Sequence, residues 1–148
     1  LHRADADPVW RERVYAYELY HWMRSAWENW PHRGRYVLNG EIDKRGYGPV
    51  ATLEGKNPDF VVHHPGRHTE NLLVIEVKTQ ANDREAIEAD IEKVKRYMDH
   101  DVLHYTTGLV LIVGHEARAA EEAAALAAKR KVMLAVHRRP GESAERLS

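Results

Sequence analysis

The sequence predicts a single α/β domain, with a mixed central sheet held between layers of helices. In the second half of the chain, apolar strand-like runs alternate with helical patterns, which is typical of parallel strands joined by right-handed crossovers. In the first half, three short strand-like runs follow one another, which indicates an antiparallel meander. We expect one domain over residues 1–148, with a core at about 9–137 and a loose tail at 138–148.

The expected elements begin with a helix over residues 9–30, where Asp7 is a suitable N-cap and Pro8 suits the first helical position. The others, in chain order, are a strand at 35–43, a hairpin with arms at 57–63 and 72–78, a helix at 84–100, a strand at 107–113, a helix at 116–130 and a strand at 131–137. Asp83 is a suitable cap for the second helix. The third has acids early and cations late, which the helix dipole favours.

One face of the first helix combines apolar residues with an acid. The residues at helical spacing on this face are Val14, Tyr15, Glu18, Trp22 and Ser25. We expect this face to pack on the core, which leaves Glu18 as a charge in apolar surroundings. Glu18 either belongs to a functional site or pairs with Arg11 or His21.

The hairpin brings three charged side chains to one end of the sheet. Its two arms are symmetric about the midpoint between positions 67 and 68, so Asp59 falls opposite Glu76. Glu76 and Lys78 are two residues apart and therefore share one face of their strand. Because an unpaired charge beside an apolar run is costly, we expect these three side chains to form one site.

Two carboxylates beside a lysine suit a divalent metal site. Mg²⁺ usually takes one or two carboxylates together with waters and substrate phosphate. Asp59 and Glu76 supply that number, and the carbonyl of Val77 adds a third oxygen. The cation would polarise a phosphate and lower the pKa of a bound water. Lys78 would position or deprotonate that water, or stabilise the charge that develops on phosphorus.

These residues resemble the PD-(D/E)XK signature of restriction-endonuclease-like nucleases. Pro58-Asp59 and Glu76-Val77-Lys78 match the two halves of the motif, and the element order over residues 9–115 is similar to the family's α-β-β-β-α-β core. The resemblance implies a three-layer core of this kind, followed here by a further helix and strand. Glu18 corresponds to the family's first-helix acid, and Gln80 to an accessory polar residue of some branches.

The resemblance implies a phosphodiesterase that depends on Mg²⁺, or Mn²⁺ in its place, and hydrolyses nucleic acid, usually DNA. The implied catalytic residues are Asp59, Glu76, Lys78 and Glu18. The implied metal contacts are Asp59, Glu76, Glu18 and the carbonyl of Val77. Small nucleases of this kind often cut double strands as dimers, so a homodimer stays open. RNA also stays open as the substrate.

Two other classes of function stay open as well. The first is a catalytically inactive nuclease-fold protein that binds nucleic acid or acts as a scaffold. The second is a structural α/β subunit, in which Glu76 and Lys78 form only an ion pair along a strand and Asp59 caps the turn after Pro58.

Composition restricts the partners and the compartment. The net charge of −1 gives no overall attraction to nucleic acid, but basic residues cluster near 33–35, 44–45, 129–131 and 138–139. These clusters either gather into a local phosphate-binding face or stay solvated. The absence of cysteine excludes disulfides and thiolate metal sites, and it suits a cytoplasmic protein. No apolar run is long enough to span a bilayer, so we expect no membrane partner.

Acids and histidines outside the hairpin site have more than one interpretation. Glu41 and Asp43, near the end of the first strand, are rival metal or substrate contacts. His63, His64 and His68 suggest zinc, but adjacent strand residues point to opposite faces, which favours surface histidines.

Aromatic residues and lysines on the helices are equally ambiguous. The tryptophans near the first helix either stack on bases or form a core or dimer face, and they are Trp10, Trp22, Trp27 and Trp30. Lys93 and Lys95 either contact a phosphate backbone or lie at a solvated helix surface.

Overall fold

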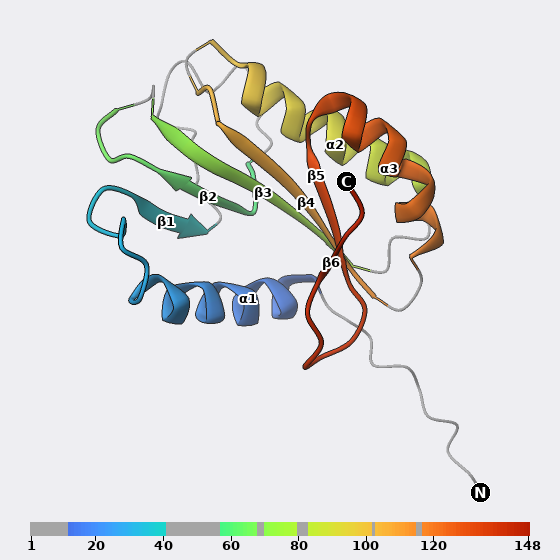
Figure 1. The fold of residues 1–148 in the computed structure, drawn as a ribbon, viewed down its shortest axis with the longest axis horizontal. Helices are drawn as coiled ribbons and strands as arrows, with labels where there is room; N and C mark the ends of the chain where they lie inside the picture. Colours follow the sequence, from blue (N-terminus) through green and yellow to red (C-terminus); the bar gives the residue numbers. More distant parts are fainter. Residues whose placement is uncertain (1–11, 41–56, 68–69, 80–82, 102, 115–116) are drawn as a thin grey trace, which may run out of the picture.

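The computed structural model describes residues 12–40, 57–67, 70–79, 83–101, 103–114 and 117–148. Its elements, in chain order, are α1 (Glu12–Trp27), β1 (Val37–Gly40), β2 (Phe60–His63), β3 (Asn71–Thr79), α2 (Arg84–Asp99), β4 (Thr107–Val113), α3 (Arg118–Arg130), β5 (Met133–His137) and β6 (Glu145–Arg146) (Figure 1). The order agrees with the expected one, except that β6 was not expected.

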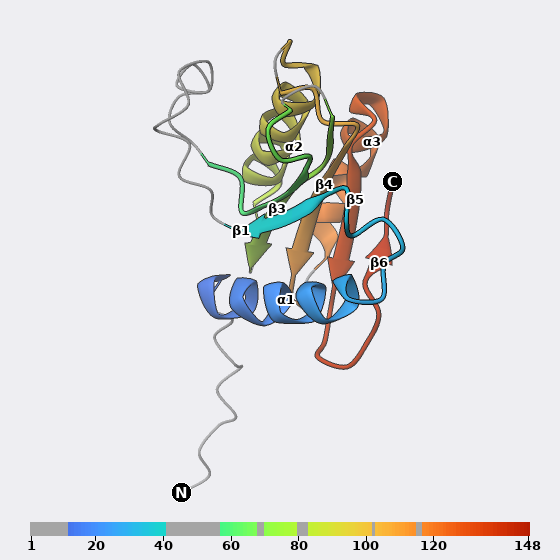
Figure 2. The same cartoon turned by 90° about the vertical axis from the view of Figure 1, so that its left-hand side faces the viewer.

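The strands form one mixed sheet in the order β1-β2-β3-β4-β5-β6. Antiparallel pairs join β1 to β2, β2 to β3 and β5 to β6, whereas β3, β4 and β5 run parallel. Figures 1 and 2 show α1 against one face of the sheet and α2 with α3 against the other. The predicted α/β class, with a mixed sheet between helices, is confirmed.

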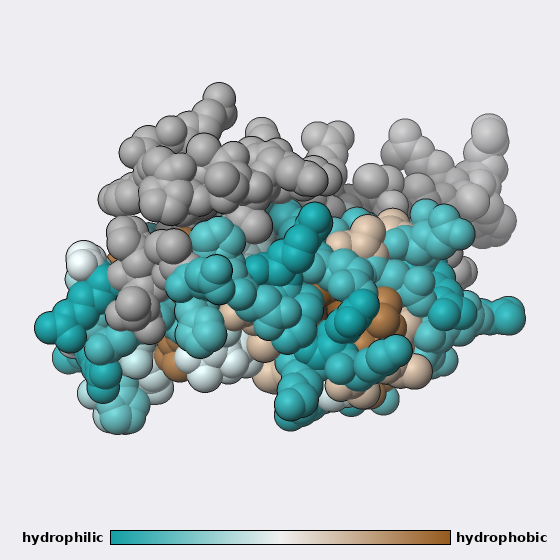
Figure 3. Space-filling view, turned by 90° about the horizontal axis from the view of Figure 1, so that it is seen from above, coloured by the Kyte–Doolittle hydropathy of each residue, from teal (hydrophilic) through white to brown (hydrophobic). Residues whose placement is uncertain are grey.

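The larger part of the core lies between the sheet and the α2–α3 layer. Each of these helices is amphipathic, and α2 turns its apolar face inward, where Ile87, Ile91 and Val94 are fully buried. The outer surface of this layer is mostly hydrophilic (Figure 3). Polar side chains of α2 can therefore contact the strands only where they border this buried face.

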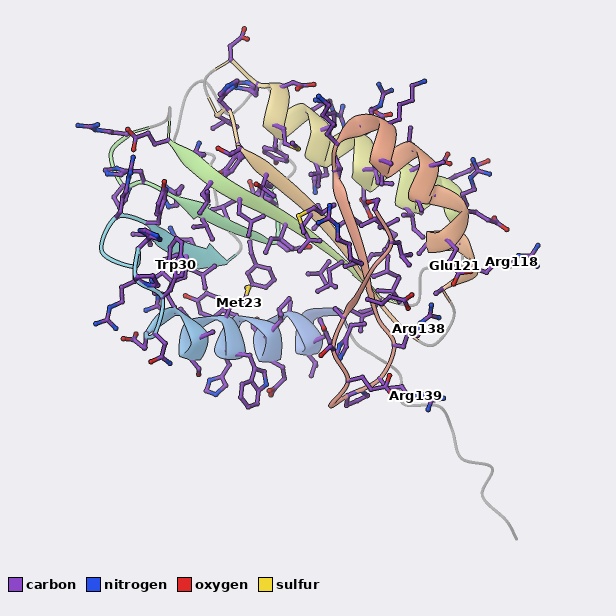
Figure 4. The ribbon with its side chains drawn as sticks, in the orientation of Figure 1. Met23, Trp30, Arg118, Glu121, Arg138 and Arg139 are labelled. Atoms are coloured by element: carbon purple, nitrogen blue, oxygen red, sulfur yellow. The ribbon has the colours of Figure 1, made fainter. Side chains whose placement is uncertain are left out.

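The α1 layer is thinner, and its orientation differs from the expected one. The residues that pack against the sheet are Tyr15, Ala16, Leu19, Tyr20 and Met23. Met23 lies between the helix and the sheet in Figure 4. Val14 and Trp22, which we placed on the core face, are 57% and 67% exposed. Of the expected face, Tyr15 packs on the sheet, whereas the placement of Val14 and Trp22 was wrong. Apolar and aromatic residues occur all round this helix, so periodicity alone does not identify its buried side.

The hairpin register is the predicted one. Phe60 pairs with Ile75 and Val61 with Val74, so the same register places position 59 opposite position 76. A register shift between Val62 and His63 lies at the far end of the pair, away from these carboxylates. The pairing of β2 with β3 beyond this shift therefore determines that the two carboxylates lie side by side.

The segment after β5 is ordered, in contrast to the loose tail that we expected. Residues of β6 pair antiparallel with β5, and the N–H of Leu147 donates to the carbonyl of Leu134 at 2.8 Å. The side chain of Leu147 also packs on the core. We expected a loose tail because the segment is short and polar. Its two-residue strand β6 instead hydrogen-bonds to backbone groups along the outer edge of β5.

Candidate metal and phosphodiester site

Asp59 is fixed against β3 by a backbone hydrogen bond. It lies just before β2, and its Oδ2 accepts from the N–H of Val77 at 2.7 Å. This contact holds the Asp59 carboxylate beside Glu76, whose pKa its charge helps to raise. The structure thus brings together the two acids that the hairpin symmetry placed opposite each other.

Glu76 is a buried carboxylate on the face of β3 that α2 covers. Its Oε1 lies 2.8 Å from Nζ of Lys93, and the whole residue is 6% exposed. Burial raises the pKa of Glu76 to about 7; Lys93 opposes this rise, whereas the charges of Asp59 and Asp90 add to it. Within the described part of the chain, Oε1 has no aligned hydrogen bond, so its contact with Lys93 is an ion pair by distance.

Lys93 is part of this site and does not lie at a solvated helix surface. Its side chain is only 17% exposed, and Nζ also donates to the carbonyl of Asn57 at 3.2 Å. Lys93 lies between Ile91 and Val94 in sequence, next to the buried face of α2. This position beside the apolar face is compatible with a contact with the sheet, but the spacing alone does not distinguish that contact from a solvated position.

Lys78 is held by a second residue of α2. Its Nζ lies 2.8 Å from Oδ2 of Asp90, and both side chains are partly buried. Asp90 did not figure among the expected site residues, although it precedes Lys93 by three positions and therefore shares its side of the helix. The site thus consists of Asp59, Glu76 and Lys78 from the hairpin and of Asp90 and Lys93 from α2.

The structure does not bring Glu18 to these residues. Glu18 is exposed on α1, on the same side as Val14 and Trp22 and away from the face that packs on the sheet. Val77 contributes its N–H to Asp59, while its side chain packs in the α1 layer of the core. Gln80, Glu41 and Asp43 lie outside the described residues.

His63 and His64 have local partners, whereas His68 and Trp10 lie outside the described residues. His63 Nε2 lies 2.7 Å from Nδ2 of Asn39, and His64 Nδ1 lies 2.9 Å from the carbonyl of Pro65. Trp27 and Trp30 contact each other, with ring centroids 4.8 Å apart, and do not extend the exposed face of α1 around Trp22. Over the residues that the structure describes, no group of three or more His, Asp or Glu side chains is arranged to hold a metal ion.

Much of the expected basic surface is neutralised locally. Arg35 lies 2.8 Å from Glu70, and Arg138 lies 3.2 Å from both Glu121 and Glu145. Figure 4 shows Arg138 close to Glu121, with Arg139 farther out. Neighbouring acids therefore partly balance the positive charge of these clusters, which weakens their attraction for phosphate.

A pocket of about 310 Å³ adjoins Asp59 on the α1 side of the sheet. Its lining residues are Ala16, Tyr17, Tyr20, Asn39, Gly40, Asp59 and Phe60. The rings of Tyr20 and Phe60 are nearly parallel, with centroids 6.2 Å apart. The pocket thus combines aromatic walls with a carboxylate of the candidate site.

The donor set suits a small, hard cation. Asp59 and Glu76 provide two carboxylates, the number that Mg²⁺ commonly takes from a protein before waters and phosphate complete its shell. The buried Oε1 of Glu76 is already paired with a cation, Lys93, which indicates that this position favours positive charge. Asp59, Glu76 and Asp90 with Lys78 and Lys93 thus form one cluster of three acids and two lysines at this end of the sheet.

Comparisons with protein-family models, curated proteins and solved structures give no match for this chain. Among the described helices, none is both long and apolar enough to cross a membrane.

Proposed function

We propose that the chain is a metal-dependent nuclease that hydrolyses phosphodiester bonds, with DNA as its substrate. The observation that carries the proposal is the fixed placement of Asp59 beside the buried Glu76, through the hydrogen bond from Val77 to Asp59. The element order α1-β1-β2-β3-α2-β4 supports the proposal, because it is the chain order that the PD-(D/E)XK resemblance implies.

In this function Asp59 and Glu76 would hold Mg²⁺, which supplies Lewis acidity and an activated water when it is bound. Lys78 would stabilise the negative charge that develops on phosphorus, or orient the attacking water. Asp90 holds Lys78 in position at 2.8 Å. The pocket beside Asp59, on the α1 side of the sheet, offers aromatic surface to a substrate that reaches this strand end, whereas Glu76 lies on the α2 side. Glu18 has no part in this mechanism.

A second function is favoured by one specific observation. Lys93 already neutralises Glu76, and Asp90 already neutralises Lys78, so the site is electrostatically satisfied without a metal. Such an arrangement suits a nuclease-fold protein that binds nucleic acid, or acts as a scaffold, without cutting it. The two functions differ in whether a metal produces turnover.

A cleavage assay tests the proposal. The protein is incubated with linear, nicked and single-stranded DNA and with RNA, in Mg²⁺, Mn²⁺ or EDTA. We expect metal-dependent cutting that falls by about 10²-fold or more in Asp59→Asn and Lys78→Met, since each removes a charge from the reacting centre. Lys95→Met is the matched control, because Lys95 lies on the same helix as Lys93 but forms its ion pair with Asp99 and not with a site residue.

The outcomes separate the alternatives. Cutting that survives in both site variants would place the activity elsewhere and defeat the proposal. Binding of DNA without cutting, unaffected by metal, would favour the scaffold.

A further inference from the structure

We propose that the ammonium group of Lys93 occupies the cation position of this site, and that a divalent metal must displace it before the site becomes competent. The inference rests on the proposed function, because it concerns the same carboxylates. In this proposal α2, through Lys93, controls the entry of the metal, whereas the motif residues on the hairpin only bind it.

The first support is the set of oxygens around Nζ of Lys93. Nζ lies 2.8 Å from Oε1 of Glu76 and 3.2 Å from the carbonyl oxygen of Asn57. Asn57 precedes Asp59 by two residues, so the two oxygens come from the same two strand ends that supply the candidate metal ligands. Carboxylate and carbonyl oxygens are the donors that hard cations use. An ammonium at this position therefore stands in for a metal ion.

The second support is electrostatic. A carboxylate as buried as Glu76 is costly without a counter-charge, and Lys93 supplies that charge while no metal is present. A divalent cation bound to the same carboxylate would repel the ammonium strongly at such short range. Lys93 occupies Oε1, so a metal that binds through this oxygen requires Lys93 to leave.

The third support is an acceptor for the displaced group. Asp90 lies three residues before Lys93, which makes their side chains neighbours on α2. The four-carbon stem of lysine allows its head group to swing while the backbone stays fixed. If Lys93 turns to Asp90, Asp90 can release Lys78, to which it is now paired at 2.8 Å. One exchange of partners would then both admit the metal and free the lysine of the motif.

Amine labelling of the intact protein tests this displacement. The chain is treated briefly with an acetylating reagent, with and without saturating Mg²⁺, and each lysine is quantified by mass spectrometry; Mg²⁺ binding is measured separately by calorimetry. We expect Mg²⁺ to raise the labelling of Lys93 by about tenfold, because its ammonium leaves the buried Glu76 for the more exposed Asp90. Labelling of Lys78 should rise with it, while Lys95, paired with Asp99, serves as the unchanged reference.

A variant provides the second arm. In Glu76→Gln, Lys93 loses its charged partner, so it should be labelled rapidly without Mg²⁺ and should not respond to it. If Mg²⁺ binds to the native protein and Lys93 stays as protected as before, the displacement is overturned while the metal site stands. If Mg²⁺ does not bind at all, the metal site and the displacement fail together.

Discussion

The carboxylate of Glu76 sets the pH response that we expect from this protein. Burial raises the pKa of Glu76 to about 7 from an ordinary value of 4.5. Because the folded state holds this proton more tightly than the unfolded chain, the free energy of unfolding falls as pH rises between these two values. The associated stability is fully present below the lower pKa and lost above the higher one, and it amounts to roughly 3 kcal/mol at most.

Urea unfolding of the wild type and of Glu76→Gln, without added metal, measures this effect. Glutamine cannot titrate, so we expect the free energy of unfolding of the wild type, relative to the variant, to fall by about 2–3 kcal/mol from near pH 5 to pH 8. Other titrating groups are common to both proteins and cancel in the comparison. Parallel pH profiles would contradict the assignment of the raised pKa to Glu76.

Asp59 has a structural role that can be separated from its proposed chemical one. Asp59→Ala removes the acceptor for the N–H of Val77, a residue that is 4% exposed. Leaving this buried donor unsatisfied should lower the free energy of unfolding by about 1–3 kcal/mol. Asp59→Asn keeps an acceptor oxygen and should cost less, although it removes the charge. Equal stability of the two variants in urea titrations would show that the hydrogen bond contributes nothing.

The pairing of Asp59 with Glu76 could be predicted from the sequence, whereas the partners of the lysines could not. Hairpin symmetry fixes the register, because two antiparallel arms around one turn leave a single alignment that buries both apolar faces. Lys93 is different: its long stem can follow an apolar surface and still place its head group in water or against the sheet. Sequence spacing alone does not distinguish these directions, so its ion pair with Glu76 emerged only from the packing of α2.

At the scale of single elements, the position of α2 depends on a close approach to β4. A methyl group at Gly108 would lie 2.7 Å from Sδ of Met98 and closer still to Cγ1 of Val94. Gly108→Ala should therefore push α2 outward and lower the free energy of unfolding by about 1–3 kcal/mol. Because α2 carries Asp90 and Lys93, the same change should disturb the candidate site.

The test of this packing is thermal or urea unfolding with two comparisons. Gly34→Ala is the matched control, since nothing lies within 4 Å of the added methyl, and its effect should stay within about 0.5 kcal/mol. In a Val94→Ala background, Gly108→Ala should cost less, because the nearest obstructing atom is gone. Additive costs of the two substitutions would argue against a direct clash.

The buried face of α1 and the presence of β6 could not be predicted from the sequence. In α1, Leu19, Tyr20 and Met23 lie on the sheet side, yet Val14 and Trp22 offer an equally apolar alternative on the other. The choice between these faces is made by the shape of the sheet surface, which periodicity does not describe. β6 has only two residues and therefore no period to detect. Its pairing follows from the open edge of β5, a feature of the assembled sheet.

At the scale of the whole molecule, the two helical layers are held by unequal amounts of buried surface. The side chains of α1 that face the sheet are only partly buried, while α2 and α3 place several fully buried residues against it. Because local opening follows the apolar contacts that must be broken, α1 should separate from the sheet without unfolding the rest. Such opening would remove the α1 wall of the pocket beside Asp59 while leaving the pairs from α2 in place.

Native-state hydrogen exchange, read residue by residue, checks this hierarchy. We expect amides in the middle of α1 to exchange at least about tenfold faster than those of β3, β4 and α2, as a sub-global opening predicts. Leu19→Ala removes a contact between α1 and the sheet, so it should accelerate exchange in α1 and leave β4 unchanged. Ile91→Ala, in the opposite layer, should instead weaken the protection of the entire domain. Equal protection of α1 and β4, with the same response to both substitutions, would mean that the two layers unfold as one cooperative unit.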